Sequence, residues 1–142
     1  MIADTDVLID FVMGEDPGAS WVAEALERGQ LSTTVITRFE LQRGARRAKR
    51  PEVLEALLAR LEAFPLLAPA ADRAAHISRD LAERGQALAE VDCLIAGIVL
   101  EHGESLLTRN RRHFARIPGL RLADLAVEGE INEPEGEAYG EP

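Results

Sequence analysis

Hydrophobic residues along the chain form short apolar runs that alternate with longer stretches of helical spacing. The short runs predict strands over residues 1–3, 31–34, 64–67, 105–108 and 120–122, with a buried strand at 64–67. The longer stretches repeat apolar residues every three or four positions and predict helices over residues 6–13, 19–28, 35–49, 51–61, 70–84 and 90–102. The segment 90–102 is apolar on nearly all sides, which indicates a helix in the centre of the protein.

Short strands that alternate with helices predict a parallel sheet with right-handed crossovers, and therefore an α/β fold. A length of 142 residues fits one domain with a sizeable core. We place this domain at residues 1–127. The segment 128–142 holds six Glu and no Lys or Arg, lacks the apolar content of a core, and is predicted to be a disordered acidic tail.

Charge is distributed unevenly along the chain. The net charge is −9, and the six glutamates of the tail account for most of it. Basic residues gather in two clusters, one made of Arg38, Arg43, Arg46, Arg47, Lys49 and Arg50, the other of Arg109, Arg111, Arg112, Arg116 and Arg121. Local clusters matter more for binding a polyanion than the total charge does, although a solvated helix face explains either cluster equally well.

The cellular setting follows from what the sequence lacks. The single cysteine, Cys93, excludes an internal disulfide and fits a reducing compartment. No stretch approaches the roughly 20 apolar residues of a membrane span. The chain begins without a basic region followed by an apolar run, so we expect no signal peptide and a cytoplasmic protein.

Three acidic residues stand at positions suited to chemistry. Asp4 follows the first predicted strand, and open parallel sheets bind ligands outside the carboxyl ends of their strands. Asp92 lies one turn into the apolar helix, where an unpaired charge is costly. Glu40 lies on a helix between apolar neighbours. Each has a structural alternative, because Asp4 and Asp92 could cap helices and Glu40 could pair with Arg43 at the surface.

A polar motif at residues 108–114 marks the end of another predicted strand. It brings Thr108, Asn110 and His113 to the same kind of sheet edge. Carboxylates without a cluster of His and Cys favour a hard cation that prefers oxygen ligands, so Mg²⁺ or Mn²⁺ fits these residues better than zinc. A lone histidine such as His113 is more often structural than a ligand.

Other chemistries lack their motifs. The chain has no phosphate-binding loop, no dinucleotide-binding glycine motif and no nucleophile elbow. Residues 4–6 imitate the Asp-x-Asp pair of haloacid-dehalogenase-like phosphatases, but Val-Leu at 7–8 stands where that family has Gly-Thr. The only lysine, Lys49, also lies in the wrong context for that reaction.

The order of the motifs resembles the PIN-domain nucleases and, within them, the VapC-type toxins of prokaryotic toxin–antitoxin pairs. That family has an opening strand with Asp-Thr-x-Val-Leu, then Thr-x-x-Glu-Leu-x-x-Gly, then Asp-x-x-Ile-Ala, and finally Thr-x-Asn-x-x-(Asp/Glu/His)-Phe with Pro-Gly-Leu. The corresponding residues here are 4–8, Thr37, Glu40, Leu41, Gly44, Asp92, Ile95, Ala96, Thr108, Asn110, His113, Phe114 and 118–120. The resemblance covers residues 1 to about 125.

The resemblance implies a three-layer α/β/α fold around a parallel sheet with strand order 3-2-1-4-5. It also implies a metal-dependent endoribonuclease whose catalytic residues are Asp4, Glu40, Asp92 and Asn110. The three acids among them would hold Mg²⁺ or Mn²⁺. Many members carry a fourth acid in the last motif, and its replacement here leaves the number of metal ions open. The resemblance also implies that Thr5, Asp6, Thr108 and His113 contact the metal ligands and support them.

The resemblance further implies a cognate antitoxin, a homodimer and an RNA substrate. Aromatic content of 4% gives little scope for base stacking, so a structured RNA such as tRNA or ribosomal RNA is favoured. The candidates for contact with its backbone are Arg43, Arg46, Arg47, Arg109, Arg111 and Arg112. The alternative is a PIN-like module that binds RNA or protein without efficient cleavage, and the phosphatase is a weaker alternative still.

Overall fold

The computed structural model describes residues 1–124, apart from the side chain of Arg47. The predicted domain end at residue 127 and the predicted acidic tail lie outside the described residues. The elements in chain order are β1 (Ile2–Ala3), α1 (Thr5–Met13), α2 (Gly18–Glu27), β2 (Thr33–Thr34), α3 (Val35–Arg43), the 3-10 turn η1 (Ala45–Arg47), α4 (Pro51–Arg60), β3 (Ala63–Phe64), α5 (Ala68–Glu83), α6 (Glu90–Glu101), β4 (Ser105–Leu107), α7 (Arg111–Phe114) and β5 (Arg121–Leu122).

The strands are short, and every pair of them is parallel, as the sequence predicts. β1 pairs with β4 in the register Ile2–Leu106 and Ala3–Leu107, and β5 joins the other edge of β4. β2 and β3 form a separate two-stranded sheet. A parallel bridge between Ile2 and Ser32 connects β1 to the residue before β2. The predicted single sheet of order 3-2-1-4-5 is therefore divided into two sheets, 3-2 and 1-4-5, with that bridge at their junction.

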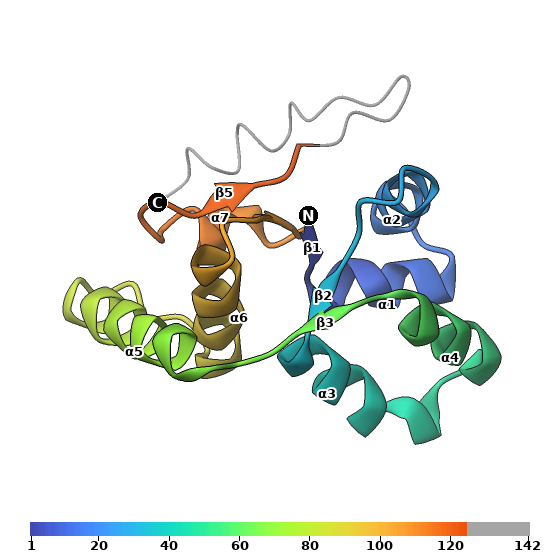
Figure 1. Ribbon diagram of the computed structural model, residues 1–142, viewed down its shortest axis with the longest axis horizontal. Coiled ribbons are helices and arrows are strands. Elements are labelled where there is room, and N and C mark those ends of the chain that lie inside the picture. The colour runs from blue at the N-terminus through green and yellow to red at the C-terminus, as the bar shows by residue number, and fades with distance from the viewer. Residues whose placement is uncertain (125–142) are drawn as a thin grey trace.

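Successive residues of the strands face two different layers of helices. Ala3 and Leu107 belong to a core cluster with residues of α1, α2 and α4, whereas Ile2 and Leu106 belong to a second cluster with residues of α5 and α6. Because neighbouring residues of a strand point to opposite faces of a sheet, the two clusters mark its two sides. Figure 1 shows α1, α2 and α4 on one side of β1, α5 and α6 on the other, and α3 below β1. The predicted layering of helices around parallel strands is confirmed.

Helices α5 and α6 pack closely against each other. Gly97 of α6 lies at the contact, where an added Cβ would be 2.5 Å from the Ala70 carbonyl oxygen and 3.1 Å from Ala74 Cβ. A side chain at residue 97 would push the two helices apart. With α5 on one side and the sheet on the other, α6 is buried as its apolar sequence predicts.

The predicted helix over residues 35–49 is wrong at its C-terminal end. α3 ends at Arg43, Gly44 follows as its cap, and a separate 3-10 turn comes next. The Gly44 N–H donates to the Glu40 carbonyl oxygen and closes the last turn of the helix. Glycine has a poor helix propensity, and beyond it the segment offers only small apolar side chains that would hold a helix in place.

The predicted buried strand over residues 64–67 is also wrong in part. The strand β3 covers Ala63–Phe64 and is half-buried. Pro65 has no N–H for a ladder hydrogen bond, so the strand ends before it. Leu67 is 61% exposed and stands as the N-terminal cap of α5.

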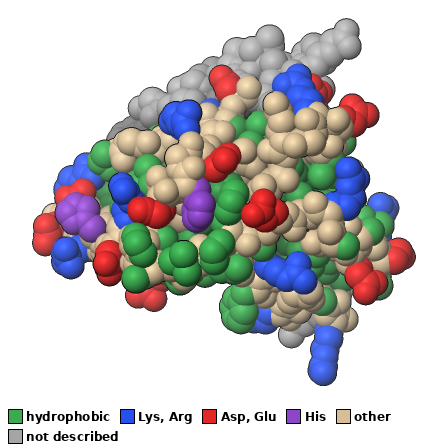
Figure 2. Space-filling model, in the orientation of Figure 1, with side chains coloured by type: hydrophobic (Ala, Val, Ile, Leu, Met, Phe, Trp, Pro, Cys, Tyr) green, Lys and Arg blue, Asp and Glu red, His purple; other side chains and the backbone are tan. Residues whose placement is uncertain are grey.

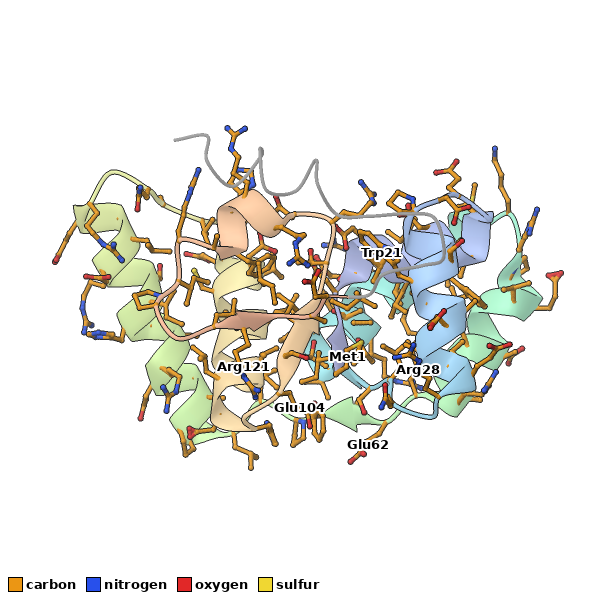
Figure 3. All side chains as sticks on the ribbon, turned by 90° about the horizontal axis from the view of Figure 1, so that it is seen from above. Met1, Trp21, Arg28, Glu62, Glu104 and Arg121 are labelled. Atoms are coloured by element: carbon orange, nitrogen blue, oxygen red, sulfur yellow. The ribbon has the colours of Figure 1, made fainter. Side chains whose placement is uncertain are left out.

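The N-terminal ammonium group is bonded to Glu104 at the start of β4. Figure 3 shows the two labelled residues, Met1 and Glu104, next to each other. This contact adds to the pairing of β1 with β4, whose carboxyl ends lead into the acidic cleft described below. None of the helices within residues 1–124 is long and apolar enough to cross a membrane.

Candidate active site

Asp4 stands at the carboxyl end of β1 and caps the N-terminus of α1. Its Oδ1 accepts a hydrogen bond from the Thr5 backbone N–H at 2.8 Å, and its Oδ2 accepts one from the Thr108 hydroxyl at 2.7 Å. The residue is only 6% exposed. The capping role foreseen as the structural alternative is therefore present, and the second oxygen also ties Asp4 to the end of β4.

Asp6 faces the same loop after β4 from the first turn of α1. Its Oδ2 accepts a hydrogen bond from the Arg109 backbone N–H at 3.1 Å and lies 3.3 Å from the Thr108 hydroxyl oxygen. That hydroxyl carries one hydrogen, and the shorter contact to Asp4 takes it. Asp6 Oδ1 is buried and has no hydrogen-bond partner among the described residues. An orphaned carboxylate oxygen is a group that a cation or a water molecule would satisfy.

Glu40 reaches the site from α3. The Thr5 hydroxyl donates to Glu40 Oε1 at 2.5 Å, and its oxygen lies 3.0 Å from the Thr37 hydroxyl oxygen. The foreseen pair with Arg43 is not formed within residues 1–124, because the Arg43 guanidinium lies over the Phe39 ring at 5.4 Å from its centroid. Glu40 is thus turned toward α1 rather than along its own helix.

Asp92 approaches from the first turn of α6 and is half-buried. In the described part of the chain, no side-chain hydrogen bond caps the N-terminus of α6, so the foreseen capping role of Asp92 is wrong. Its carboxylate instead lies within electrostatic range of Glu40, Asp6 and His113. Asp92 therefore joins the acids of α1 and α3.

Burial and mutual repulsion act on the acids together. Burial, the charge of Asp6 and the charge of Asp92 raise the pKa of Asp4 from 3.8 to about 7, against hydrogen bonds that lower it. Burial and then the charges of Glu40 and Asp6 raise the pKa of Asp92. Burial also raises the pKa of Asp6. The fold therefore concentrates negative charge in a place where solvation is poor.

The acids line one open cleft of about 470 Å³. Its lining consists of Asp4, Thr5, Asp6, Ile9, Glu40, Asp92, Arg109 and Asn110. The structure thus brings together the four residues that the resemblance nominates as catalytic. Perturbed acids that converge in a cleft are a recognised mark of a functional site.

Asn110 and His113 occupy the places where many related sequences have an acid. The Asn110 backbone N–H donates to the Thr108 hydroxyl oxygen at 3.0 Å, and the His113 Nδ1 is hydrogen-bonded to Asn110 Oδ1. An amide oxygen accepts, so the imidazole nitrogen is the donor of that bond. His113 therefore orients the Asn110 side chain, and its charge lowers the pKa of Asp92.

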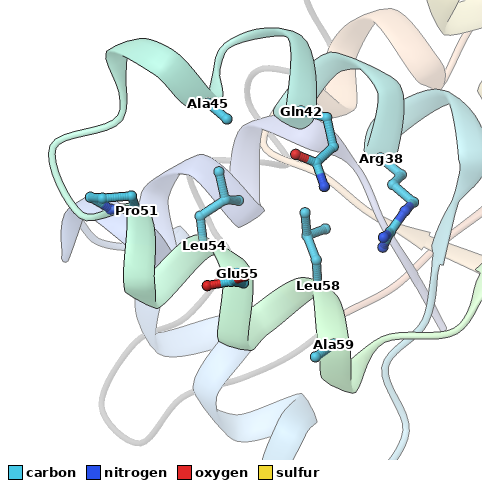
Figure 4. A pocket seen from close by; sticks show the side chains of 8 residues that line it. All are labelled: Arg38, Gln42, Ala45, Pro51, Leu54, Glu55, Leu58 and Ala59. Atoms are coloured by element: carbon cyan, nitrogen blue, oxygen red, sulfur yellow. The ribbon is translucent and has the colours of Figure 1, made fainter.

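A second cavity, of about 440 Å³, lies between α3 and α4. Figure 4 shows Arg38 and Gln42 of α3 opposite Leu54 and Leu58 of α4. Of the described residues that line this cavity, Glu55 is the one acid. It offers no group of carboxylates, and the acidic cleft is therefore the candidate active site.

Asp10 is a buried acid that sequence analysis did not single out. It is 4% exposed, and its Oδ2 accepts a hydrogen bond from Arg109 Nε at 2.6 Å while its Oδ1 accepts one from Arg109 Nη2 at 3.3 Å. The signal that could have found it is its spacing from Asp6. Residues four apart lie on one face of a helix, so Asp10 extends the acidic face of α1.

The side chain of Arg111, one of the predicted RNA contacts, is bound within the protein. The side chain is buried, its Nη1 donates to the Ala123 carbonyl oxygen at 2.5 Å, and its Nη2 lies 4.0 Å from Asp124. Arg111 therefore supports the chain after β5 and is not positioned to meet a substrate. Arg109, in contrast, lines the acidic cleft.

Three of the other predicted RNA contacts lie at the surface. Arg43, Arg46 and Arg112 are exposed, and the side chain of Arg47 lies outside the described part of the structure. Figure 2 shows basic and acidic side chains interspersed over the face that it presents. On that face, the basic side chains do not form a continuous patch.

The donor set of the cleft fits a hard cation. Among the described residues, no three His, Cys, Asp or Glu side chains are already arranged around a point where an ion could sit. The cleft nevertheless brings four carboxylates together and leaves the buried Asp6 Oδ1 without a partner. Carboxylate oxygens are the ligands that Mg²⁺ and Mn²⁺ prefer. A cation would also offset the burial and the repulsion that together raise the pKa of Asp4.

Comparison with known sequences identifies the family. The PIN domain matches residues 1–120. A tRNA(fMet)-specific endonuclease VapC of Shigella flexneri is 30% identical over 125 residues, which cover 85% of this chain and 94% of that protein. Ribonuclease VapC19 of Mycobacterium tuberculosis is 32% identical over 128 residues, which cover 84% of this chain and 96% of that protein. The phosphatase alternative is therefore wrong.

Comparison with solved structures agrees. The DNA-bound VapBC of Salmonella typhimurium has a chain with 30% identity and a TM-score of 0.72, over 87% of this chain and 96% of that one. A chain of VapBC2 from Rickettsia felis, bound to a promoter fragment, has a TM-score of 0.73 at 22% identity and supports the fold alone. Because the match in sequence and fold spans most of the molecule, the chain belongs to the PIN-domain family, among the VapC-type ribonuclease toxins.

Proposed function

We propose that the protein hydrolyses phosphodiester bonds of structured RNA in the acidic cleft, with Mg²⁺ or Mn²⁺ as cofactor. The observation that carries this proposal is the convergence of Asp4, Asp6, Glu40 and Asp92 on one cleft at the carboxyl ends of β1 and β4. Their charges are not balanced in the protein itself, which is why burial and repulsion raise the pKa of Asp4 to about 7. Transfer RNA is the first candidate substrate, since the Shigella flexneri relative is named as a tRNA(fMet)-specific endonuclease.

Asp4, Glu40 and Asp92 would hold the metal, and Asp6 Oδ1 is a further available oxygen. A divalent ion supplies an activated water molecule and stabilises charge on the phosphate oxygens. The chain itself orients the donors. The Thr108 hydroxyl and the Thr5 N–H fix the two oxygens of Asp4.

The Thr5 hydroxyl directs Glu40 into the site. Its oxygen also lies 3.0 Å from the Thr37 hydroxyl oxygen, which links this contact to the first turn of α3. Asn110 is oriented by His113 and lines the cleft, which supports a role in binding a water molecule or a phosphate oxygen.

The exposed Arg43, Arg46 and Arg112 are candidates for contact with the RNA backbone away from the reaction centre. A cognate antitoxin and a homodimeric state belong to the same proposal. Support for the antitoxin comes from the solved chains of similar fold, among them one with 26% identity from a toxin–antitoxin complex of Klebsiella pneumoniae.

Cleavage of a mixture of tRNA and ribosomal RNA tests the proposal. The purified protein is incubated with Mg²⁺, Mn²⁺ or EDTA, beside Asp92→Asn and the control Asp80→Asn, which removes a half-exposed acid of α5 that pairs with Arg84. We expect discrete fragments that require the metal, a loss of roughly 10³-fold in rate for Asp92→Asn, and no loss for Asp80→Asn.

Cleavage that persists in EDTA at the rate seen with metal would overturn the proposal. RNA binding without cleavage in either metal would instead favour the alternative of a PIN-like binding module. If fragments arise from ribosomal RNA and not from tRNA, the reaction stands and the first substrate candidate falls.

A further inference from the structure

The pair formed by Asp10 and Arg109 is built into the wall of the acidic cleft. Arg109 is the one basic residue among the described residues that line the cleft. Its guanidinium donates two hydrogen bonds to the Asp10 carboxylate, from Nε to Oδ2 at 2.6 Å and from Nη2 to Oδ1 at 3.3 Å. The two partners differ in exposure, since the Arg109 side chain is 44% exposed and the Asp10 side chain 6%. The guanidinium therefore lies at the surface, within electrostatic range of Asp6 in the cleft, and the Asp10 carboxylate faces the protein interior.

The geometry leaves part of the guanidinium available. An arginine side chain has five N–H donors in a planar fork, and Asp10 engages the Nε–H and one N–H of Nη2. The remaining donors have no hydrogen-bond partner in the described part of the chain. A fixed planar guanidinium with free N–H groups can form bidentate hydrogen bonds with phosphate oxygens.

Gly18 keeps Asp10 in this position. A Cβ at residue 18 would lie 2.2 Å from Asp10 Oδ2 and 2.6 Å from Asp10 Cβ, so the first residue of α2 must be glycine for the carboxylate to fit. Asp10 lies in α1 and Arg109 directly after β4, 99 residues apart. The pair therefore depends on the packing of α2 against α1 and not on local sequence.

We propose that Arg109 contacts a phosphate of the RNA in the cleft, and that Asp10 is a positioning residue that holds Arg109 for this contact. The inference rests on the proposed ribonuclease function. A polyanion that enters a cleft lined by four carboxylates meets repulsion, and Arg109 gives it a favourable contact at the edge of the acids. Because Asp10 fixes the guanidinium before RNA binds, little side-chain conformational freedom is lost on binding.

Cleavage kinetics and RNA affinity of four variants test the inference. Arg109→Gln removes the positive charge, and Arg109→Lys keeps the charge but lacks the planar set of N–H donors. Asp10→Asn weakens the ion pair with Arg109. Gly18→Ala displaces Asp10 without altering either partner of the pair. The matched control is the exposed pair of Arg84 and Asp80, changed to Arg84→Gln and Asp80→Asn. Affinity is measured with labelled tRNA in EDTA, so that this readout does not depend on the metal.

We expect Arg109→Gln to lower kcat/KM roughly 10- to 100-fold and to weaken RNA binding, as for the loss of a charge-assisted hydrogen bond. The slope of log affinity against log salt should fall by roughly 0.7 to 0.9, the value for one phosphate contact. Arg109→Lys should recover part of the loss. Asp10→Asn and Gly18→Ala should each lower kcat/KM roughly tenfold through misplacement of Arg109.

A double-mutant cycle separates positioning from a general structural role. In the Arg109→Gln background, Asp10→Asn should cause no further loss of kcat/KM, because its effect passes through Arg109. Losses that simply multiply would overturn the positioning role of Asp10. Wild-type rates and affinity in Arg109→Gln would overturn the phosphate contact while leaving the ribonuclease function intact. A wild-type protein that neither cleaves nor binds RNA would overturn both proposals.

Discussion

Two buried aspartates, one that caps helix α1 and one within it, have opposite electrostatic surroundings. Asp4 precedes the first turn of this helix and Asp10 lies in its last half, and they are 6% and 4% exposed. Asp10 has a cationic partner in Arg109, at 2.6 Å. Asp4 has a hydroxyl, a backbone N–H and further acids around it, and its pKa is raised to about 7.

The difference separates an acid that is open to a cation from outside the chain from an acid that already has a cationic partner within it. A buried carboxylate beside an arginine is compensated by the protein, so removal of it leaves an unpaired cation. A buried carboxylate among other acids is compensated only when something outside the chain binds. The two aspartates should therefore respond in opposite directions when each is replaced.

The largest expected effect on stability belongs to Asp10. Asp10→Ala should lower the free energy of unfolding by about 2 to 3 kcal/mol, below the usual cost of breaking a fully buried pair because Arg109 is partly exposed and can be solvated. Urea unfolding measures this change, and Asp80→Ala, which removes an acid from an exposed pair, should cost less than about 0.5 kcal/mol. Equal losses in the two variants would contradict the role given to Asp10.

Replacement of Asp4 should raise the free energy of unfolding, the opposite of the effect at Asp10. The pKa of Asp4 in the folded protein is raised above 3.8, so the folded state holds the proton more tightly and stability falls as the pH rises from about 4 to about 7. Asp4→Asn removes that loss. In EDTA at pH 8 the variant should be more stable than the wild type by about 1 to 3 kcal/mol, less than the full shift at about 1.4 kcal/mol per pKa unit because the amide pairs less well with its donors.

Urea unfolding at pH 4 and pH 8 measures this second effect. At pH 4 the advantage of Asp4→Asn should be nearly gone, since both proteins then carry a neutral side chain at residue 4. A variant that is less stable than the wild type at both pH values would mean that the charge of Asp4 is compensated within the protein.

The smallest expected effect concerns the acids at the other end of the chain. Deletion of residues 128–142 removes six glutamates and few apolar residues, among them Ile131 and Tyr139, and it should change the free energy of unfolding by less than about 0.5 kcal/mol. Unfolding of the truncated chain at low and high salt measures the change. A large loss at either salt concentration would show that these glutamates stabilise the domain, as Asp10 does.

The sequence pattern alone predicted part of the surroundings of Asp4. The carboxyl ends of parallel strands meet at one edge of a sheet, so Asp4 after β1 and Asn110 after β4 had to lie close together. The placement of Glu40 and Asp92 at helix positions facing that edge came from the family resemblance. The layers of helices followed from the spacing of apolar residues, because each helix needs one buried face.

The pair of Asp10 and Arg109 could not be predicted in the same way. Its partners are 99 residues apart, and the close approach of Gly18 that holds it is a property of packing. The burial of Arg111 could not be predicted either, since a cluster of basic residues in the sequence does not show which side chain will donate a hydrogen bond to a backbone carbonyl oxygen. The early end of α3 at Arg43 is signalled by Gly44, whereas the apolar spacing predicts a helix that continues to residue 49.

The most direct test of the central claim is thermal unfolding in increasing Mn²⁺ at pH 7.5, for the wild type, Asp4→Asn and Asp10→Asn. A cation that binds only the folded cleft raises Tm with concentration. The account predicts a rise for the wild type, no rise for Asp4→Asn, and a rise for Asp10→Asn from a lower starting Tm. An equal rise in the wild type and Asp4→Asn, or no rise in either, would contradict the assignment of the acidic cleft as a metal-binding centre.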